Sequence, residues 1–492
     1  MTEALATNEA ADEFCEDCGY EPELKRTLNG FQVFAISFAS LSVAVGIFAT
    51  YDDVLRDSGP IGIWLFPIVA IGQILVALVY AQFAARIPLS GSSYAWASRL
   101  VSPKVGWAFG WLAVISAVAG PVTIDNALAS QCLMPLLGMV PDENTARVIT
   151  VIVLVIQAVL AIAATRIVGW VNSLSVGVEL GILLVIGVAL TVAILVTGNG
   201  SAANLFSRGI TEGDPDFFVV GGGLMAASIM GLSTLVGFET ASNMAEEAKN
   251  PTRSVPRAII GSVVAASVLG MLFVIVLTVS ITDMAKVSNT ESPVAEIMNQ
   301  RFGPGFERPL LAAITLAFFG AALVSMVSGA RYIYAMSRDG RFPGYPVMRR
   351  VNPKTRTPIP ATLLVLVVGV ILMAVMPGDA LLQLIMAGAI VTILPYLMTI
   401  ILYLATRHKL DRKPGGFDLG RWEWPVAIGA LVWVIISLFI VITTSPTMAP
   451  VVIAFGLSAA GGLYFVYMWK FDREVLEHEP GDPTMFEEVE QS

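Results

Sequence analysis

Twelve runs of apolar residues, each about as long as a bilayer is thick, constrain this chain more than any other feature. A helix needs about 20 apolar residues to cross the hydrocarbon core, and its backbone hydrogen bonds have to close within the segment. Only 14% of the residues are charged, against about 25% in soluble domains. We therefore expect an all-α polytopic membrane protein with twelve transmembrane helices. The expected spans are residues 29–52, 61–85, 105–137, 146–165, 169–197, 219–244, 257–281, 309–337, 359–376, 380–405, 424–443 and 449–469.

The basic residues are divided unequally between the two sides of the membrane that these spans define. Of the 29 Lys and Arg residues, all but six lie on the side of the N-terminus. Cytoplasmic loops carry the excess of basic residues, so we expect a multi-pass protein of the plasma (inner) membrane with both termini in the cytoplasm. The six exceptions are Arg56, Arg147, Arg208, Lys286, Arg301 and Arg308.

Four large aromatic residues flank the second and third spans. Tryptophan and tyrosine are enriched where a membrane meets water. We therefore expect Tyr94, Trp96, Trp107 and Trp111 to belong to an interfacial aromatic belt.

The net charge of −9 comes mostly from the two ends of the chain. Residues 1–28 and 470–492 are acidic and lack apolar periodicity, so we expect solvated, disordered cytoplasmic tails. Their charge gives no support for a nucleic-acid partner. Cys15 and Cys18 form a CxxC without a second pair of ligands, so we expect neither a metal site nor a cofactor.

The spans are arranged as two sets of five followed by two more. Residues 29–197 and 219–405 form the two sets, and residues 424–469 hold two extra helices. The third span of each set is unusually long, which predicts a strong tilt. Because five is an odd number, the second set enters the membrane in the opposite orientation. The sequence thus predicts a 5+5 inverted repeat.

The first span of each set carries a serine and a glycine at mid-depth, Ser42 and Gly46 in one and Ser233 and Gly237 in the other. Paired, glycine-interrupted helices in inverted halves indicate a transporter binding site, because unwound backbone exposes N–H and C=O groups to a ligand. We therefore expect spans 1 and 6 to be broken. The alternative is that these glycines merely allow close helix packing.

Three carboxylates lie within the apolar spans, where a charge is costly and usually functional. Glu239 follows the expected break in span 6; it either takes and releases a proton or fastens span 6 to a neighbour by hydrogen bonds. Asp125, with Thr123 and Asn126 beside it, either faces the cavity and attracts a substrate amine or clamps two helices together. For Glu179, a structural hydrogen bond to span 1 or span 8 competes with proton coupling.

Three segments of the chain resemble the amino acid, polyamine and organocation (APC) permeases. Any one of the motifs alone is weak, but their combination is specific, and the resemblance extends over about residues 25–470. The chain looks closest to the amino acid and choline branch of this family, whose substrates include GABA, choline and related amines. The segments are QFAARIPLSGSSYAWASRLVSPKVGWAFGWL, GFETASNMAEEAKNPTRSVPRAI and SGARYIYAMSRDGRFPGYPVMRRVNPKTRTPIPA.

The resemblance implies a LeuT-like fold, in which broken spans 1 and 6 hold the substrate between a mobile bundle and a scaffold. It implies that a substrate carboxylate meets backbone N–H groups near Ala44, Val45 and Gly46. The substrate amine is implied to meet carbonyls of span 6, and Phe238 to close over the substrate. With the polar residues of span 3, the expected substrate-binding set is Ser42, Ala44, Val45, Gly46, Thr123, Asp125, Asn126, Ser233, Leu235, Val236, Gly237, Phe238 and Ser325.

The chain departs from the family pattern at two places. Many members have a Gly-Ser-Gly break in span 1, whereas this sequence reads Ala44-Val45-Gly46, which removes a hydroxyl from the expected carboxylate site. Ser233 and Ser325 stand where some relatives have bulky aromatic residues. A gate built from tryptophans is therefore not expected.

The coupling ion is the least determined of these expectations. By family analogy Ser325 and Ser328 on span 8 face the break in span 1, where their hydroxyls and span-1 carbonyls offer the oxygen ligands that a hard cation such as Na⁺ takes. Ordinary hydrogen bonding between helices is the alternative. Because titratable carboxyls outnumber credible sodium ligands, we expect a proton ahead of sodium.

These patterns together predict a secondary-active transporter and not an enzyme. It moves an amino acid or a related amine, such as GABA, choline or a polyamine, by alternating access, coupled to protons or run as an exchanger. The competing hypothesis is an intramembrane prenyltransferase, because Asp52, Asp53 and Asp57 loosely resemble a diphosphate-Mg²⁺ motif. The second aspartate-rich motif that such enzymes need is missing from the sequence.

Overall fold

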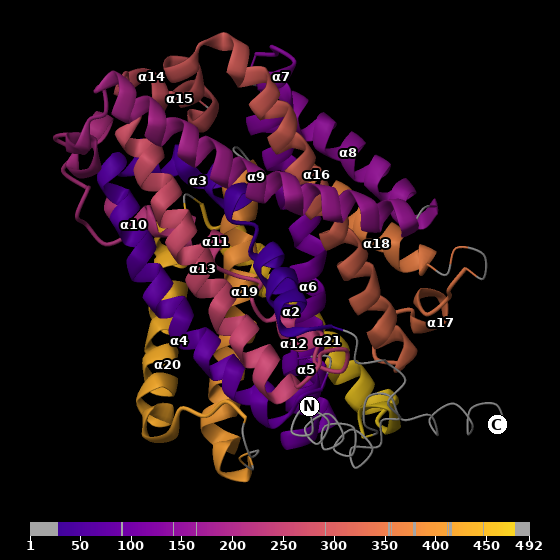
Figure 1. Cartoon of the computed structure of the whole chain (residues 1–492). Helices are drawn as coiled ribbons and strands as arrows, with labels where there is room; N and C mark the ends of the chain where they lie inside the picture. The colour runs from indigo at the N-terminus through magenta and orange to yellow at the C-terminus, as the bar shows by residue number, and fades with distance from the viewer. Residues whose placement is uncertain are drawn as a thin grey trace.

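The protein is described by a computed structural model of the chain, shown in Figure 1. Its secondary structure is helical throughout the described part, apart from one isolated bridge between Leu28 and Ala248. The predictions for residues 1–27 and 478–492 of the acidic tails, and for Cys15 and Cys18, fall on residues outside this part. The expectation of a disordered tail is wrong for residues 470–477, because the last long helix continues to Phe471, Leu476 is buried, and the Arg341 side chain donates to the Val475 carbonyl at 3.2 Å. The structure describes residues 28–89, 92–140, 142–163, 165–290, 292–352, 355, 357–376, 380–410, 412, 416–445 and 447–477.

Ten helical segments of the described chain are long and apolar enough to cross a membrane, and two shorter apolar helices, Gly223–Thr234 and α18 (Ile359–Val375), complete the twelve expected positions. The long segments contain α2 (Gly30–Leu41) with α3 (Val43–Asp57), α4 (Leu65–Arg86), α6 (Pro103–Ala127) with α7 (Met134–Leu136), α8 (Glu143–Ala163), α9 (Thr165–Thr197), α13 (Pro251–Val279), α16 (Pro304–Arg338), α19 (Ala380–Thr406), α20 (Glu423–Thr444) and α21 (Ala449–Phe471).

Shorter helices connect or interrupt these spans. Between α6 and α7 the chain makes a π-helical turn at Leu128–Leu133. The sixth span is divided into α10 (Gly223–Ala226), α11 (Ser228–Thr234) and α12 (Thr240–Asn243); the connecting helices are α5 (Ser92–Leu100), α14 (Met284–Ser288), α15 (Pro293–Phe302) and α17 (Tyr345–Met348).

Helices at matching places in the two expected halves pack against each other. The pairs α3 and α11, α4 and α13, α6 and α16, and α8 and α18 are all in contact. Such pairing is what a two-fold axis between two inverted halves requires. The observed helices therefore have the arrangement of a 5+5 inverted repeat, while the residue boundaries given above for each half stay predictions.

The helices form two packed groups, with the last two helices on the outside. One group contains α2, α3, α4, α11 and α13, and the other contains α6, α8, α16 and α18. The long helix α9 contacts α3, α13 and α16, so it touches both groups. On one flank α20 lies beside α4, and α21 packs on α19 and α6 (Figure 1).

Span 1 is broken, as expected, but the break lies at Ser42 and not at Gly46. Ser42 has φ 47° and ψ 61°, a left-handed conformation that ends α2 and begins α3. Gly46 is inside α3, and its N–H donates to the Ser42 carbonyl at 2.9 Å. A left-handed serine is uncommon, so the glycine was the stronger signal in the sequence and the prediction of the position was wrong.

Gly46 instead allows span 1 to approach span 6 closely. A Cβ atom on this residue would lie 2.5 Å from the Thr234 Oγ1 and 3.0 Å from the Thr234 Cα. No side chain fits into that space without moving a backbone. For Gly46, close helix packing is therefore the interpretation that the structure supports.

Span 6 is broken at Gly237, as predicted. Residues 235–239 separate α11 from α12, and Gly237 has φ 98°. A Cβ atom here would lie 2.7 Å from the Ser40 carbonyl oxygen. The Ser37 hydroxyl donates to the Phe238 carbonyl at 3.1 Å. The end of α2 thus supplies a partner for backbone that the break in span 6 leaves outside a helix.

The prediction of an interfacial aromatic belt is wrong for Trp96 and Trp107, which are buried. Trp96 stacks on Phe83 with ring centroids 4.8 Å apart, and its Nε1 donates to the Ile87 carbonyl at 3.1 Å. The Trp107 Nε1 donates to the Arg341 carbonyl at 2.9 Å. A buried tryptophan N–H usually finds a hydrogen-bond acceptor. Here backbone carbonyls are the acceptors, whereas lipid headgroups or water accept this bond at a membrane interface.

We predict that Gly237→Ala destabilises the protein by about 1–3 kcal/mol, because alanine at this φ is strained and its Cβ meets the Ser40 carbonyl. The measurement is thermal unfolding of the purified protein in detergent. Gly388→Ala is the matched control, since a Cβ on Gly388 in α19 meets no atom within 4 Å. Equal melting temperatures for the two variants would contradict the tight packing of the break.

Candidate functional site

The first turn of α3 holds a carboxylate at a backbone N–H group. The Ala44 N–H donates to Oε1 of Glu179 on α9 at 3.1 Å, while the Ser42 hydroxyl donates to the Ala39 carbonyl at 3.1 Å. The N-terminal N–H groups of a helix have no partner inside the helix and favour negative charge. The buried side chain of Glu179 therefore occupies the donors that the family resemblance reserves for a substrate carboxylate. The expectation that Gly46 is one of these donors is wrong, because its N–H is used within α3.

The non-helical segment of span 6 lies opposite this turn. Leu235 and Val236 stand outside both α11 and α12, which is the condition for their carbonyls to meet a ligand. The Ser233 hydroxyl donates to the Ile229 carbonyl one turn back at 2.8 Å, within α11. Leu235 itself is fully buried.

Glu239 is held by a tyrosine from another helix. The Tyr396 hydroxyl, on α19, donates to Glu239 Oε2 at 2.8 Å and accepts from the Gly237 N–H at 3.2 Å. One phenol thus joins the carboxylate and the broken backbone of span 6 to α19.

Three aromatic rings pack around this contact. Phe238 is fully buried, stacks on Tyr396 with centroids 5.2 Å apart, and meets Tyr80 of α4 edge-on at 5.8 Å. The Tyr80 hydroxyl accepts a hydrogen bond from the Ser93 hydroxyl at 3.1 Å and is hydrogen-bonded to the Thr399 hydroxyl at 3.0 Å. Phe238 therefore lies beneath a layer of aromatic side chains.

Tyr80 and Tyr396 were missed by sequence reasoning, although a signal existed. Each is a tyrosine in the interior of an apolar span, Tyr396 directly after Pro395. A buried phenol usually finds a hydrogen-bond partner. Such tyrosines indicate a polar group on a neighbouring helix, but their spacing does not say which one.

Two of the three polar residues of span 3 hydrogen-bond to α8. Asp125 is fully buried, and its Oδ1 accepts from the Gln157 amide of α8 at 2.8 Å. The Asn126 amide donates to Thr150, also on α8, at 3.1 Å. The Thr123 hydroxyl donates to the Ala119 carbonyl at 3.1 Å within α6. These contacts favour the helix clamp over the substrate site for Asp125 and Asn126.

The serines of span 8 lie at a tight helix crossing. A Cβ on Gly120 of α6 would lie 2.5 Å from the Ser325 Oγ, so the serine packs directly over the glycine. Ser328 lies three residues further along α16, a helix that also contacts α3. This packing favours ordinary contacts between helices, and a sodium site at these serines stays an untested prediction.

The aspartates of the competing enzyme hypothesis are engaged inside the protein. Asp52 and Asp53 are buried in α3. Asp52 accepts a hydrogen bond from the Gln131 amide at 3.2 Å and pairs with Arg56 at 3.6 Å. An exposed cluster of free carboxylates for a diphosphate-Mg²⁺ group is therefore not present at these two residues.

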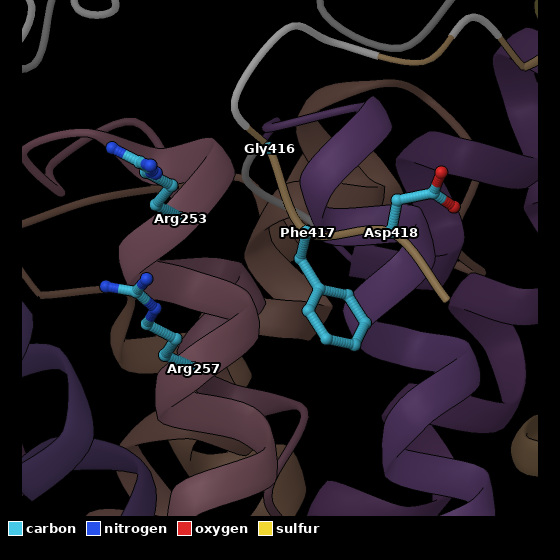
Figure 2. A pocket seen from close by; sticks show the side chains of 5 residues that line it. All are labelled: Arg253, Arg257, Gly416, Phe417 and Asp418. Atoms are coloured by element: carbon cyan, nitrogen blue, oxygen red, sulfur yellow. The ribbon is translucent and has the colours of Figure 1, made fainter. Parts of the chain in front are cut away.

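A surface pocket lies at the start of α13, next to the segment that leads to α20 (Figure 2). Its lining residues are Arg253, Arg257, Gly416, Phe417 and Asp418. The Phe417 N–H donates to the Thr252 carbonyl at 3.2 Å, which ties the segment to α13. Figure 2 shows both arginine side chains pointing away from the Phe417 ring. None of the residues at the two helix breaks lines this pocket.

Comparisons with known proteins agree on one family. The profile of the family described as amino acid permease matches residues 28–456. A rice (Oryza sativa subsp. japonica) protein named amino-acid permease BAT1 homolog is 27% identical, over 92% of this chain and 91% of its own length. A Candida albicans protein named putative polyamine transporter is 25% identical, over 87% of this chain and 80% of its own.

One solved structure extends the comparison to the fold. The crystal structure of a manganese transporter from Eremococcus coleocola matches with a TM-score of 0.51 at 13% identity, over 92% of this chain and 99% of that one. At this identity the match concerns the arrangement of the helices alone. It agrees with the all-helical fold of this chain.

Proposed function

Because the chain belongs to the amino acid permease family, we propose that it is a secondary-active transporter that moves an amino acid or a related amine by alternating access. The observation that carries the proposal is the meeting of two helix breaks, at Ser42 and at residues 235–239, where backbone groups bond to side chains of other helices and not within their own helix. Unwound backbone at membrane depth is tolerated where it is buried or lines a cavity. The relatives are transporters, so the prenyltransferase alternative is set aside.

The substrate class is supported by the names of the relatives. They include amino-acid permeases, a putative polyamine transporter and a human protein named cationic amino acid transporter 4. A positively charged amine is common to all these substrates. The carbonyls beside Leu235 and Val236 and the carboxylates of Glu179 and Glu239 are the groups that would receive it.

We propose a proton as the coupling ion, with Glu239 as its carrier. Among the described residues, the side chain that hydrogen-bonds to this carboxylate is Tyr396 on α19, while the backbone of Glu239 belongs to the broken part of span 6. A change in the position of span 6 relative to α19 alters that hydrogen bond and so the affinity of Glu239 for a proton. Ser325 packs directly over Gly120, and this contact gives less support for a sodium site than the Tyr396 contact gives for a proton site at Glu239.

The orientation in the membrane is also a proposal. The charge distribution supports a plasma membrane location with both acidic tails in the cytoplasm. We also propose the division of the chain that the inverted repeat predicts. It consists of two five-helix halves, at residues 29–197 and 219–405, and an additional pair of helices at residues 424–469.

The proposed function predicts saturable uptake into liposomes that contain the purified protein. The panel consists of labelled amino acids, GABA, choline and polyamines, each tested with and without an acidic exterior. With proton symport, the acidic exterior speeds uptake, because protons move down their gradient with the substrate. Empty liposomes are the control, and the absence of saturable uptake of every compound would contradict the proposal.

Glu239→Gln is predicted to remove the dependence of uptake on the pH gradient while leaving exchange of substrate across the membrane. The amide keeps an acceptor for the Tyr396 hydroxyl but cannot titrate. Uptake rates are compared between about pH 5 and about pH 8, a range in which a buried carboxyl group can gain or lose a proton. Glu212→Gln, at an exposed acid, is the matched control. An unchanged pH profile in Glu239→Gln assigns this residue to helix fastening.

Native cysteines report the orientation of the N-terminal tail. Cys15 and Cys18 lie in the tail, and Cys132 is buried. A membrane-impermeant maleimide is predicted to label inside-out vesicles and to spare intact cells. The double variant Cys15→Ser/Cys18→Ser provides the background, and labelling of intact cells would place the tail outside.

A further inference from the structure

The N-terminal turn of α3 is filled by a side chain of the protein itself. The Ala44 N–H donates to the Glu179 Oε1 at 3.1 Å. In a transporter of amino acids, the N–H donors of this turn are the natural place for a substrate carboxylate, because α3 is a fifteen-residue helix whose dipole favours an anion there. Two carboxylates cannot use one set of donors.

A buried group beside this turn lacks a partner. The hydroxyl of Thr234, at the end of α11, is fully buried, and no hydrogen-bond partner for it occurs among the described residues. It lies against Gly46, one residue after Val45. A buried hydroxyl without a partner is unfavourable. Because Gly46 packs tightly on Thr234, a polar group of a ligand can reach this hydroxyl only when spans 1 and 6 separate.

The surroundings of Glu179 offer no counter-charge. The hydrogen-bond partner of its carboxyl group among the described residues is the Ala44 N–H. The helices packed against α9, which are α3, α8, α13 and α16, bring no charged side chain to it among the residues that the structure describes. A mobile cation is therefore the partner that this carboxylate lacks.

We propose that Glu179 is a specificity-determining residue that occupies the carboxylate subsite and selects cationic amines without a carboxylate over the corresponding α-amino acids. This inference rests on the proposed transport function. An amine is attracted by Glu179 and leaves the bonds to α3 in place. An α-amino acid brings a second carboxylate, which has to displace Glu179 or bind beside its charge.

A change in pH is expected to alter the affinity for α-amino acids and the affinity for amines in opposite directions. Protonation of Glu179 removes its negative charge and weakens its hold on the donors of α3. Binding of an α-amino acid then becomes tighter as the pH falls. Binding of the amine becomes weaker, because the attraction is lost. One side chain thus moves the two affinities in opposite directions.

The test uses pairs of ligands that differ only in the α-carboxylate, lysine with cadaverine and ornithine with putrescine. Binding to the purified full-length protein is measured by competition with a labelled member of each pair. Wild type is predicted to prefer the amine, and Glu179→Gln to reduce this preference by about tenfold, which corresponds to about 1.4 kcal/mol. Glu179→Asp keeps the charge and retains a preference for the amine. Glu212→Gln, at an exposed acid, is the control that leaves the preference unchanged.

The outcomes separate this inference from the proposed function. Equal affinity for both members of a pair in wild type, or an unaltered preference in folded Glu179→Gln, overturns the role of Glu179 while transport stands. Binding of no member of either pair, together with no uptake of any compound of the liposome panel, overturns the transport function itself. If Glu179→Gln does not fold, the pH profile of wild type decides: a preference that stays constant between about pH 8 and about pH 5 contradicts the inference.

Discussion

The structure depends on how it satisfies the backbone groups that two broken helices leave without helical partners. In a bilayer such groups have no water to bind, so each one has to be met by the protein or by a ligand. At the span 1 break, the Glu179 carboxylate accepts a hydrogen bond from the Ala44 N–H. At the span 6 break, the Ser37 hydroxyl donates to the Phe238 carbonyl, and the Tyr396 hydroxyl accepts from the Gly237 N–H. These partners come from three other helices and hold the breaks together.

The two carboxylates next to the breaks have different surroundings, which gives them different proposed roles. Glu179 rests on donors at a helix N-terminus, a position that favours its negative charge. Glu239 rests on one phenol, and the rings of Tyr80 and Phe238 surround that phenol. The first arrangement suits a carboxylate that selects a ligand by its charge and loses the selection when it binds a proton. The second suits a group whose protonation changes when α19 and span 6 move apart.

The sequence predicted the helices well because each crossing requires a long apolar run. Gly237 was also predictable, since its φ of 98° is open to glycine at little cost. The break at Ser42 was not, because nothing in a serine signals a left-handed conformation. Tyr396 was missed for another reason: its role depends on a carboxylate more than 150 residues away. The burial of Trp96 likewise followed from helix packing and not from its place near a span end.

By itself the sequence determined the class of the protein, its apolar spans and the presence of paired interruptions in spans 1 and 6. Those features follow from local composition, because a membrane restricts which segments can cross it. Tertiary structure alone decided that Gly46 packs on Thr234 and that Asp125 binds Gln157. It also decided that Glu179 fills the N-terminus of α3. The physical reason is that a hydrogen bond between distant helices depends on their register and tilt, which no local pattern of residues specifies.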